Sequence, residues 1–155
     1  MQSTPHLLKA DAIAAMAEVQ KVHGLNPDAV RNTRSLGDAL GMKNLGVHLV
    51  RVEPGKETTQ FHLHHHEEEF LYILSGRGLA CIGEEHFEVG PGDFMGFTAP
   101  SLPHALSNPF EVDLVYLMSG ERRSFDVVDY PRLRKRLFRF DGKRQLVEWD
   151  NLQKF

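Results

Sequence analysis

The chain has 155 residues, 41% of them hydrophobic, which suits one domain with a substantial core. Its formal net charge is −3, from 18 basic and 21 acidic side chains mixed along the sequence, so neither nucleic acid nor a membrane is an expected partner. The single cysteine, Cys81, excludes an intramolecular disulfide and favours a reducing compartment. Charged residues interrupt every apolar run near the N-terminus, so we expect a cytoplasmic protein without a leader or membrane span.

The first predicted element is a short, peripheral helix. Thr4 and Pro5 offer a cap and a first-turn proline, an alanine-rich stretch follows, and Gly24 ends it. We therefore expect a helix within residues 9–24, in an N-terminal extension that covers residues 1–44.

From residue 45 onward the pattern is that of strands. Short apolar or alternating runs each end in Gly, Pro, Asn or Ser, and such runs at this spacing predict a sandwich or barrel over residues 45–118. Gly76, Gly78 and Gly83 fall in tight turns, where they would supply positive φ. The runs are LGVHLVRVEPG, FLYILSGRGLACIG, HFEVGPGDFMGF, HALSN and EVDLVYLMSG.

The C-terminal extension, residues 119–155, continues the pattern of strands separated by turns. In RLFRFDGKRQLVEW, Asp141 and Gly142 separate two runs, which is a strong signal for a two-residue hairpin. No helical repeat and no long linker divides the chain, so we expect one domain over residues 1–155.

The stretch FHLHHHEEEFLYILSG, residues 61–76, combines four histidines and three glutamates with an apolar run. It could be a solvated loop, a metal site or a tag-like cluster. Because side chains alternate along a strand, His62 and His64 would share one face and converge on one point. Glu69 opens the next run and can place a carboxylate beside them. The best candidate for a third imidazole is His104, in the segment APSLPHALSN.

The spacing of these residues resembles the first sequence motif of the cupins, a family of small antiparallel β-barrels. His62-x-His64 is followed after four residues by Glu69, and after six more by Gly76. Gly55, one residue farther back than the glycine that usually precedes this motif, indicates a slightly longer approach loop.

PGDFMGFTAPSLPHALSN resembles the second cupin motif. Gly92 and Asp93 come first, then a proline-rich loop, then His104 and, four residues later, Asn108. Ser101 stands where that loop usually has glycine. The resemblance covers residues 45–118 and is strongest to small stand-alone cupins of unassigned activity.

The resemblance implies an all-β fold: a cupin double-stranded β-helix, or jelly-roll barrel, with a short N-terminal helix and a C-terminal β-hairpin. It also implies a metal ion held by four ligands. Imidazoles with one carboxylate suit a divalent transition ion (Zn, Fe, Mn, Ni, Co or Cu) better than calcium or fully oxygen-coordinated magnesium. The implied ligands are His62, His64, Glu69 and His104.

The rest of the cluster is expected to form a solvated turn. His65 and His66 fall between the ligand positions, and Glu67 and Glu68 keep the turn soluble unless one of them orients a ligand imidazole.

If Glu69 points inward, Leu71 and Ile73 do so too and line an apolar cavity floor. Either Phe94 and Gly96 or Met95 and Phe97 join them, in a pocket for a small oxygen-bearing organic ligand. A phosphorylated substrate would need converging cations. The cations near the motif strands are Arg51 and Arg77, and the sequence places neither of them in the pocket.

Phe70, Tyr72 and Leu74 occupy the strand face opposite Glu69, so we expect the N-terminal helix, the C-terminal hairpin or a second subunit to cover them. Of these, we favour a second subunit, which would make the protein a homodimer.

The function hypothesis is a small metalloenzyme with dioxygenase- or isomerase-type chemistry on a small-molecule substrate. One alternative is a non-catalytic module that binds or senses a small metabolite, and another is a barrel whose histidines are merely solvated.

Overall fold

The computed structural model describes residues 6–154, and most of its regular structure is β. Three antiparallel sheets have the strand orders β1-β2-β3-β10-β5-β8, β7-β6-β9 and β13-β12-β11-β4. The strands are β1 (Val19–His23), β2 (Asn26–Ser35), β3 (Leu45–Val52), β4 (Leu63–His64), β5 (Glu69–Ser75), β6 (Gly78–Ile82), β7 (Glu85–Val89), β8 (Phe94–Phe97), β9 (His104–Ser107), β10 (Leu114–Glu121), β11 (Phe125–Tyr130), β12 (Lys135–Phe140) and β13 (Lys143–Glu148). The helices are α1 (Ala10–Ala15), α2 (Leu36–Ala39) and two single 3-10 turns, η1 (Pro131–Leu133) and η2 (Trp149–Asn151).

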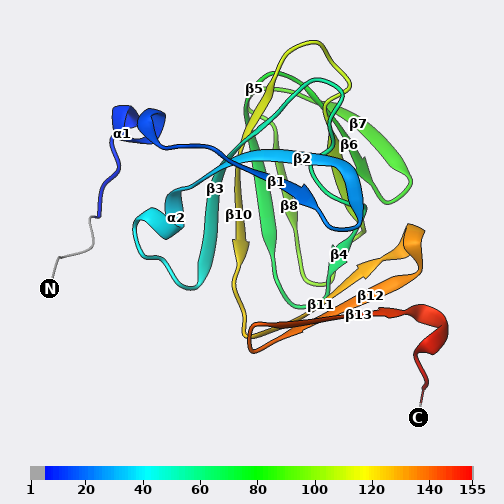
Figure 1. Ribbon diagram of the computed structural model, residues 1–155. Coiled ribbons are helices and arrows are strands. Elements are labelled where there is room, and N and C mark those ends of the chain that lie inside the picture. Colours follow the sequence, from blue (N-terminus) through cyan, green and yellow to red (C-terminus); the bar gives the residue numbers. More distant parts are fainter. Residues whose placement is uncertain (1–5, 155) are drawn as a thin grey trace, which may run out of the picture.

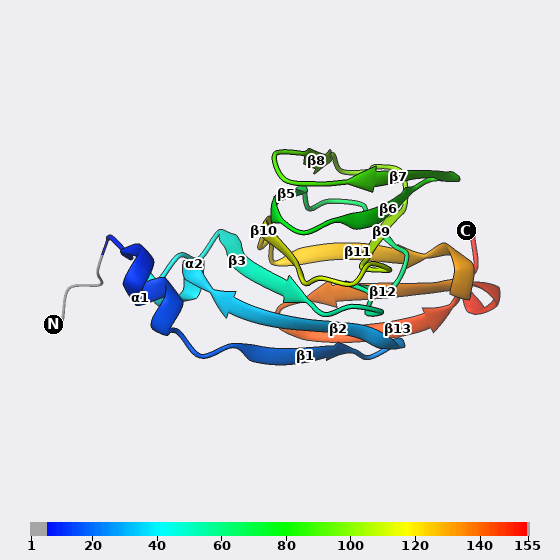
Figure 2. The same ribbon diagram turned by 90° about the horizontal axis from the view of Figure 1, so that it is seen from above.

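The large sheet and the three-stranded sheet face each other across one core, as the two views in Figure 1 and Figure 2 show. Alternate residues of β3, β5 and β10 point into it, and Val50, Ile73, Leu114 and Tyr116 have no exposed surface. The predicted all-β jelly-roll barrel is confirmed. Within residues 6–154, no helix is long and apolar enough to cross a membrane.

The N-terminal extension differs from the prediction. Helix α1 covers only Ala10–Ala15, and the second half of the expected helix is strand β1, which pairs with β2. Strand β2 in turn pairs with β3 and so joins the barrel sheet. Sheet pairing here outweighs a weak helix propensity, helped by the β-branched Val19 and Val22. The proposed cap at Thr4 and Pro5 lies outside the described residues.

The turns mostly follow the prediction. Asp141 and Gly142 join β12 to β13 with φ values of 48° and 75°, as a two-residue hairpin requires, so that hairpin is confirmed. Gly76 and Gly83 also have positive φ, at 74° and 59°. Gly78 does not; a Cβ there would lie 2.7 Å from a methyl group of Leu106, so close packing is its role.

Strand β11 was not among the predicted strands, yet it fixes the C-terminal hairpin to the barrel. It pairs with β12 along its length and with β4 at residues 63–64. The hairpin therefore lies across the lower end of the barrel in Figure 1, next to the histidine-rich segment.

Candidate metal centre

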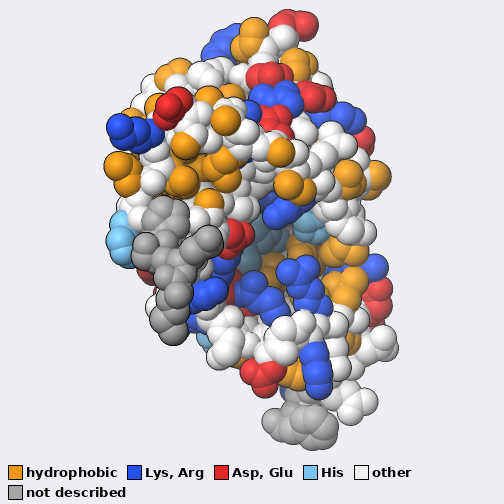
Figure 3. All heavy atoms as spheres, turned by 60° about the vertical axis from the view of Figure 1, so that its left-hand side comes forward, with side chains coloured by type: hydrophobic (Ala, Val, Ile, Leu, Met, Phe, Trp, Pro, Cys, Tyr) orange, Lys and Arg blue, Asp and Glu red, His pale blue; other side chains and the backbone are white. Residues whose placement is uncertain are grey.

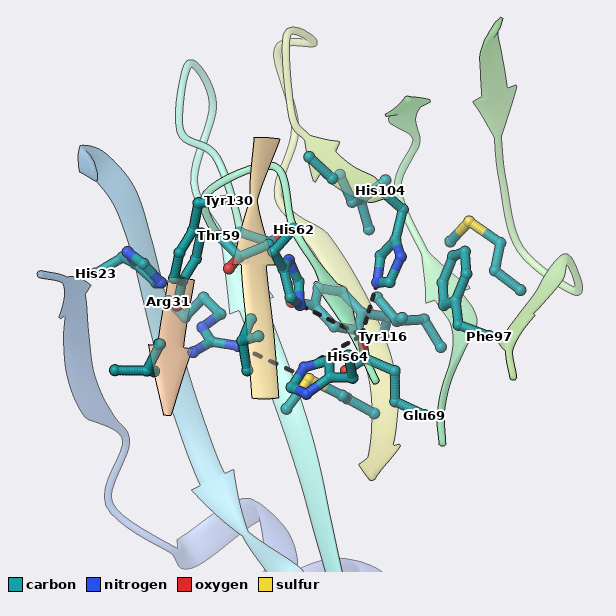
Figure 4. A pocket seen from close by; sticks show the side chains of 18 of the residues that line it. His23, Arg31, Thr59, His62, His64, Glu69, Phe97, His104, Tyr116 and Tyr130 are labelled. Atoms are coloured by element: carbon teal, nitrogen blue, oxygen red, sulfur yellow. Dashed lines mark hydrogen bonds and ion pairs between the residues drawn. The ribbon is translucent and has the colours of Figure 1, made fainter. Parts of the chain in front are cut away.

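Four side chains meet at the inner face of the barrel, around the carboxylate of Glu69 (Figure 4). Its Oε1 lies 2.6 Å from Nε2 of His104, 3.5 Å from Nε2 of His62 and 3.9 Å from Nε2 of His64. His62 and His104 are buried and are held side by side by two backbone hydrogen bonds, which form an isolated antiparallel bridge. The structure thus brings together all four residues that the sequence singled out as ligands.

The other ring nitrogen of each imidazole has its own acceptor. The Nδ1–H of His62 donates to the Gln60 carbonyl at 2.9 Å, and that of His104 to the Leu102 carbonyl at 3.2 Å. The Nδ1–H of His64 donates to a side chain instead, Oδ2 of Asp126, at 2.6 Å. Each Nε2 is therefore left to face the cavity with its lone pair.

The charges of the cluster are strongly coupled. Burial opposes ionisation of Glu69, but the close imidazoles of His104 and His62 outweigh burial and hold the pKa of this carboxyl well below its usual value. Burial lowers the pKa of His62. Burial also disfavours the charged form of His64, yet its bond to Asp126 and the nearby Glu69 raise its pKa overall. The site thus combines an ionised carboxylate with a largely neutral His62.

This donor set fits a divalent transition ion. The ligand atoms of His62, Glu69 and His104 all lie within 4.8 Å of one another, and His64 reaches the same carboxylate oxygen. Three imidazole nitrogens with fixed tautomers and one carboxylate are the ligands that such an ion prefers. A second group of possible ligand atoms within 4.8 Å of one another adjoins the first, formed by His64, Glu67 and Asp126.

Sequence reasoning missed Asp126, because it lies on the unpredicted strand β11, and it misjudged Glu67. Glu67 is buried rather than solvated; it accepts the backbone N–H of Arg123 at 2.7 Å and pairs with Arg139. A glutamate amid charged neighbours gave no sign of this burial. The residue that orients the candidate ligand His64 is thus Asp126, and not one of the two glutamates in the turn.

The remaining members of the histidine stretch point elsewhere. His65 pairs with Asp129 at 2.8 Å, on the other face of β11. His66 and Glu68 are exposed.

The four side chains face a cavity of about 280 Å³ with an apolar floor. Leu71, Met95 and Phe97 line it, whereas Ile73 lies in the core and is not among the described side chains that line the cavity. The hydroxyl of Tyr116 is buried there without a hydrogen-bond partner, and burial raises its pKa to about 12.

Cations converge on this cavity, which the sequence alone did not establish. Arg31, Arg139 and Arg144 line its wall. The two arginines that the sequence suggested lie elsewhere: Arg51 binds Glu18 and its neighbours on the outer surface, and Arg77 is exposed. Figure 3 shows the hollow, with histidine at its depth and Lys and Arg side chains around it. Arg31 and Arg144 could not be placed from the sequence, because strands remote from the motifs carry them.

Comparisons with known proteins agree with this architecture. The family model described as "Cupin domain" matches residues 48–120. A crystal structure named "Putative sugar phosphate isomerase", from Acidithiobacillus ferrooxidans, is 46% identical, covers 96% of both chains and has a TM-score of 0.95. A cupin-superfamily sugar phosphate isomerase from Silicibacter pomeroyi shares the fold at 24% identity, with 94% of both chains covered and a TM-score of 0.81.

An uncharacterised protein of Methanocaldococcus jannaschii is 39% identical over 66 residues, which are 43% of this chain and 52% of that protein. This chain thus matches about half the length of that curated relative. With the barrel, the two motifs and the full-length match to the Acidithiobacillus protein, the chain belongs to the cupins.

Proposed function

We propose that this protein is a metal-dependent isomerase that acts on a small phosphorylated sugar. The observation that carries the proposal is the arrangement of three imidazoles around one carboxylate, all facing the same cavity. The reaction class is supported by the Acidithiobacillus ferrooxidans protein, whose name gives this activity and which matches the present chain along nearly its whole length.

The ligands of the ion would be His62, His64, Glu69 and His104. A divalent transition ion supplies a Lewis acid, which polarises the oxygens of a sugar. Glu69 would be a ligand rather than the catalytic base, because a carboxylate with a lowered pKa is a weak base.

The cavity wall would orient the sugar. The unpartnered hydroxyl of Tyr116 is available to donate to, or accept from, a substrate oxygen. The floor of Leu71, Met95 and Phe97 excludes water beside the ligands. A single cysteine and a metabolite substrate both suit a reducing compartment, so we place the proposed activity in the cytoplasm.

The first test is elemental analysis of untagged protein purified without a metal column. We expect one transition ion per chain, and a strong loss of that ion in His64→Ala. His86→Ala is the matched control, because His86 is exposed on β7, away from the site. Metal-free protein, or equal loss in the control, would contradict the metal centre.

The second test is turnover. Protein loaded with Mn, Fe, Zn or Co is incubated in D₂O with a panel of aldose and ketose phosphates, and interconversion is followed by NMR. We expect at least one pair to interconvert, with a loss of about a hundredfold or more in His64→Ala. Tight metal and ligand binding without any turnover would contradict the isomerase and favour a non-catalytic binding module.

A further inference from the structure

The metal cavity does not end at the surface; it opens into a second, outer groove of about 640 Å³. Five side chains line both spaces and form what we call the neck: His23, Arg31, Tyr130, Leu137 and Arg144. In Figure 4, His23, Arg31 and Tyr130 lie together on the side of the cavity away from Phe97 and His104. A ligand that reaches the metal centre from the groove must pass this neck.

The two arginines of the neck differ from others nearby in having no anionic partner. Arg139 is paired with Glu67, and Arg136 is held by Asp129 through two hydrogen bonds. Within residues 6–154, no carboxylate lies within salt-bridge distance of Arg31 or Arg144, and the polar contact of Arg31 is a 3.8 Å approach to the sulfur of Met118. Their guanidinium donors are therefore available to a ligand.

The surroundings contain little to neutralise these cations. Glu69, inside the metal cluster, is the only acidic residue among the described side chains that line the cavity or the groove. Lys21 adds a further cation in the outer groove. Two unpaired arginines facing one space suit a dianion with several oxygens, which the guanidinium fork binds through paired hydrogen bonds.

His23 adds a neutral donor. Its Nδ1 accepts the backbone N–H of Leu25 at 3.1 Å, so the proton of the neutral ring is on Nε2. Burial and the neighbouring cations lower the pKa of His23, which keeps the ring neutral. Its ring packs edge-on against Tyr130, with centroids 5.8 Å apart, which fixes its orientation.

We propose that the neck is a binding site for a phosphate monoester, with Arg31 and Arg144 as the clamp and His23 as a further donor. The inference rests on the proposed function in one respect: the sugar attached to the phosphate extends inward to the metal centre. The phosphate is then at the end of the sugar remote from the reacting carbonyl group. The site therefore selects sugars phosphorylated on the terminal carbon and disfavours sugar 1-phosphates.

The binding test uses inorganic phosphate titrated calorimetrically into metal-free and metal-loaded protein. We expect Arg31→Gln and Arg144→Gln each to weaken binding by about tenfold or more in both forms. Arg144→Lys should recover only part of the phosphate affinity, because lysine restores the charge but not the paired N–H donors of the guanidinium group. Lys143→Gln is the matched control: it removes the same charge from the adjacent position of β13, where the side chain is exposed and lines neither space.

Arg144 is exposed, so its replacement leaves the packed core intact, and circular dichroism checks the fold of the Arg31 variant. Phosphate affinities equal to that of the unmodified protein in both arginine variants, or an equal loss in Lys143→Gln, would overturn the neck site. If phosphate binding depends on the arginines but no sugar phosphate is turned over, the proposed function fails and the phosphate site stands.

In the turnover assay, Arg144→Gln should raise KM for terminally phosphorylated sugars about tenfold, with a smaller change in kcat. Preferential turnover of 1-phosphates would contradict the inferred orientation even if the isomerase activity is real.

Discussion

Asp126 is a buried carboxylate that holds the candidate ligand His64 in one orientation. It has no exposed surface and receives the Nδ1–H of His64 at 2.6 Å, which fixes the ring in the orientation that turns Nε2 inward. We predict that Asp126→Asn lowers metal affinity by roughly 10–100-fold, as removal of such partners does in metal sites. Competition titration with a zinc chelator measures the change.

Asp129→Asn is the matched control for this experiment. Asp129 lies on the same strand and also contacts a histidine, but His65 is not a candidate ligand. The metal affinity of this variant should stay within about twofold of the unmodified protein. Equal losses in both variants would show that the effect is structural and not specific to His64.

Tyr116 combines complete burial with a hydroxyl that has no partner, an arrangement that costs stability unless a ligand uses the group. We predict that Tyr116→Phe leaves Tm unchanged or raises it, while kcat/KM for the sugar phosphate falls about tenfold. Thermal unfolding and steady-state kinetics test the two halves. A lower Tm with unchanged kinetics would assign the hydroxyl to the fold.

The sequence identified the four candidate ligands because strand alternation and motif spacing are local properties. It put His62 and His64 on one face and Glu69 beside them, and the structure joins His104 to them. That these residues bind metal stays a prediction. The sequence could not place Arg31 and Arg144 in the cavity, because their positions depend on the pairing of β2 with β3 and of β12 with β13.

Among the structural elements, the pairing of β11 with β12 includes an ion pair between a buried carboxylate and a partly exposed arginine. Asp129 is 6% exposed and accepts two hydrogen bonds from Arg136, at 2.6 and 2.8 Å. Burial opposes its ionisation, but the bonds from Arg136 and His65 outweigh this, so the pKa of Asp129 is lowered. A carboxyl with a lowered pKa stabilises the folded state above its unfolded pKa, about 3.9, and loses this contribution as pH falls through its folded pKa.

We therefore predict that Asp129→Asn lowers the free energy of unfolding by about 1–3 kcal/mol at pH 7. The difference in this free energy between the two proteins should shrink below about pH 4. Thermal unfolding of both proteins from pH 3 to pH 7 measures it. A difference that does not change with pH would mean that packing, and not charge, explains the loss.

The N-terminal element shows why the helix prediction failed in part. Alanine-rich sequence favours a helix at Ala10–Ala15, where no partner strand competes. At Val19–His23, the neighbouring β2 offers a complete antiparallel register, for example Val22 opposite Val30. Local propensity could not reveal that partner, whereas the hairpin at Asp141 and Gly142 was predictable because the turn itself determines the pairing.

For the whole molecule, the outer face of the six-stranded sheet is the notable surface. Tyr72 and Leu74 on β5 are 39% and 44% exposed, and Phe94 on the neighbouring β8 is 63% exposed. Neither the N-terminal helix nor the C-terminal hairpin covers them, although the sequence predicted that something would. We propose that a second copy of this chain does so, in a homodimer.

The dimer predicts that Leu74→Glu combined with Phe94→Glu gives a monomer in sedimentation velocity, while the unmodified chain sediments as a dimer. Phe87→Glu is the control, since Phe87 is 44% exposed but lies on β7, in a different sheet. A monomeric unmodified chain at micromolar concentration would contradict the proposal.

The positions of the site residues along the chain have a consequence for how such proteins diversify. All four candidate ligands lie between residues 48 and 120, the part that matches the cupin model, whereas His23, Arg31, Tyr130 and Arg144 all lie outside it. The four candidate ligands and the proposed entrance thus belong to separate stretches of the chain, although Asp126, which holds His64, lies with the entrance residues. Exchange of the two flanking segments would then change the entrance and leave the four candidate ligands in place, provided that the new C-terminal segment keeps a carboxylate at position 126.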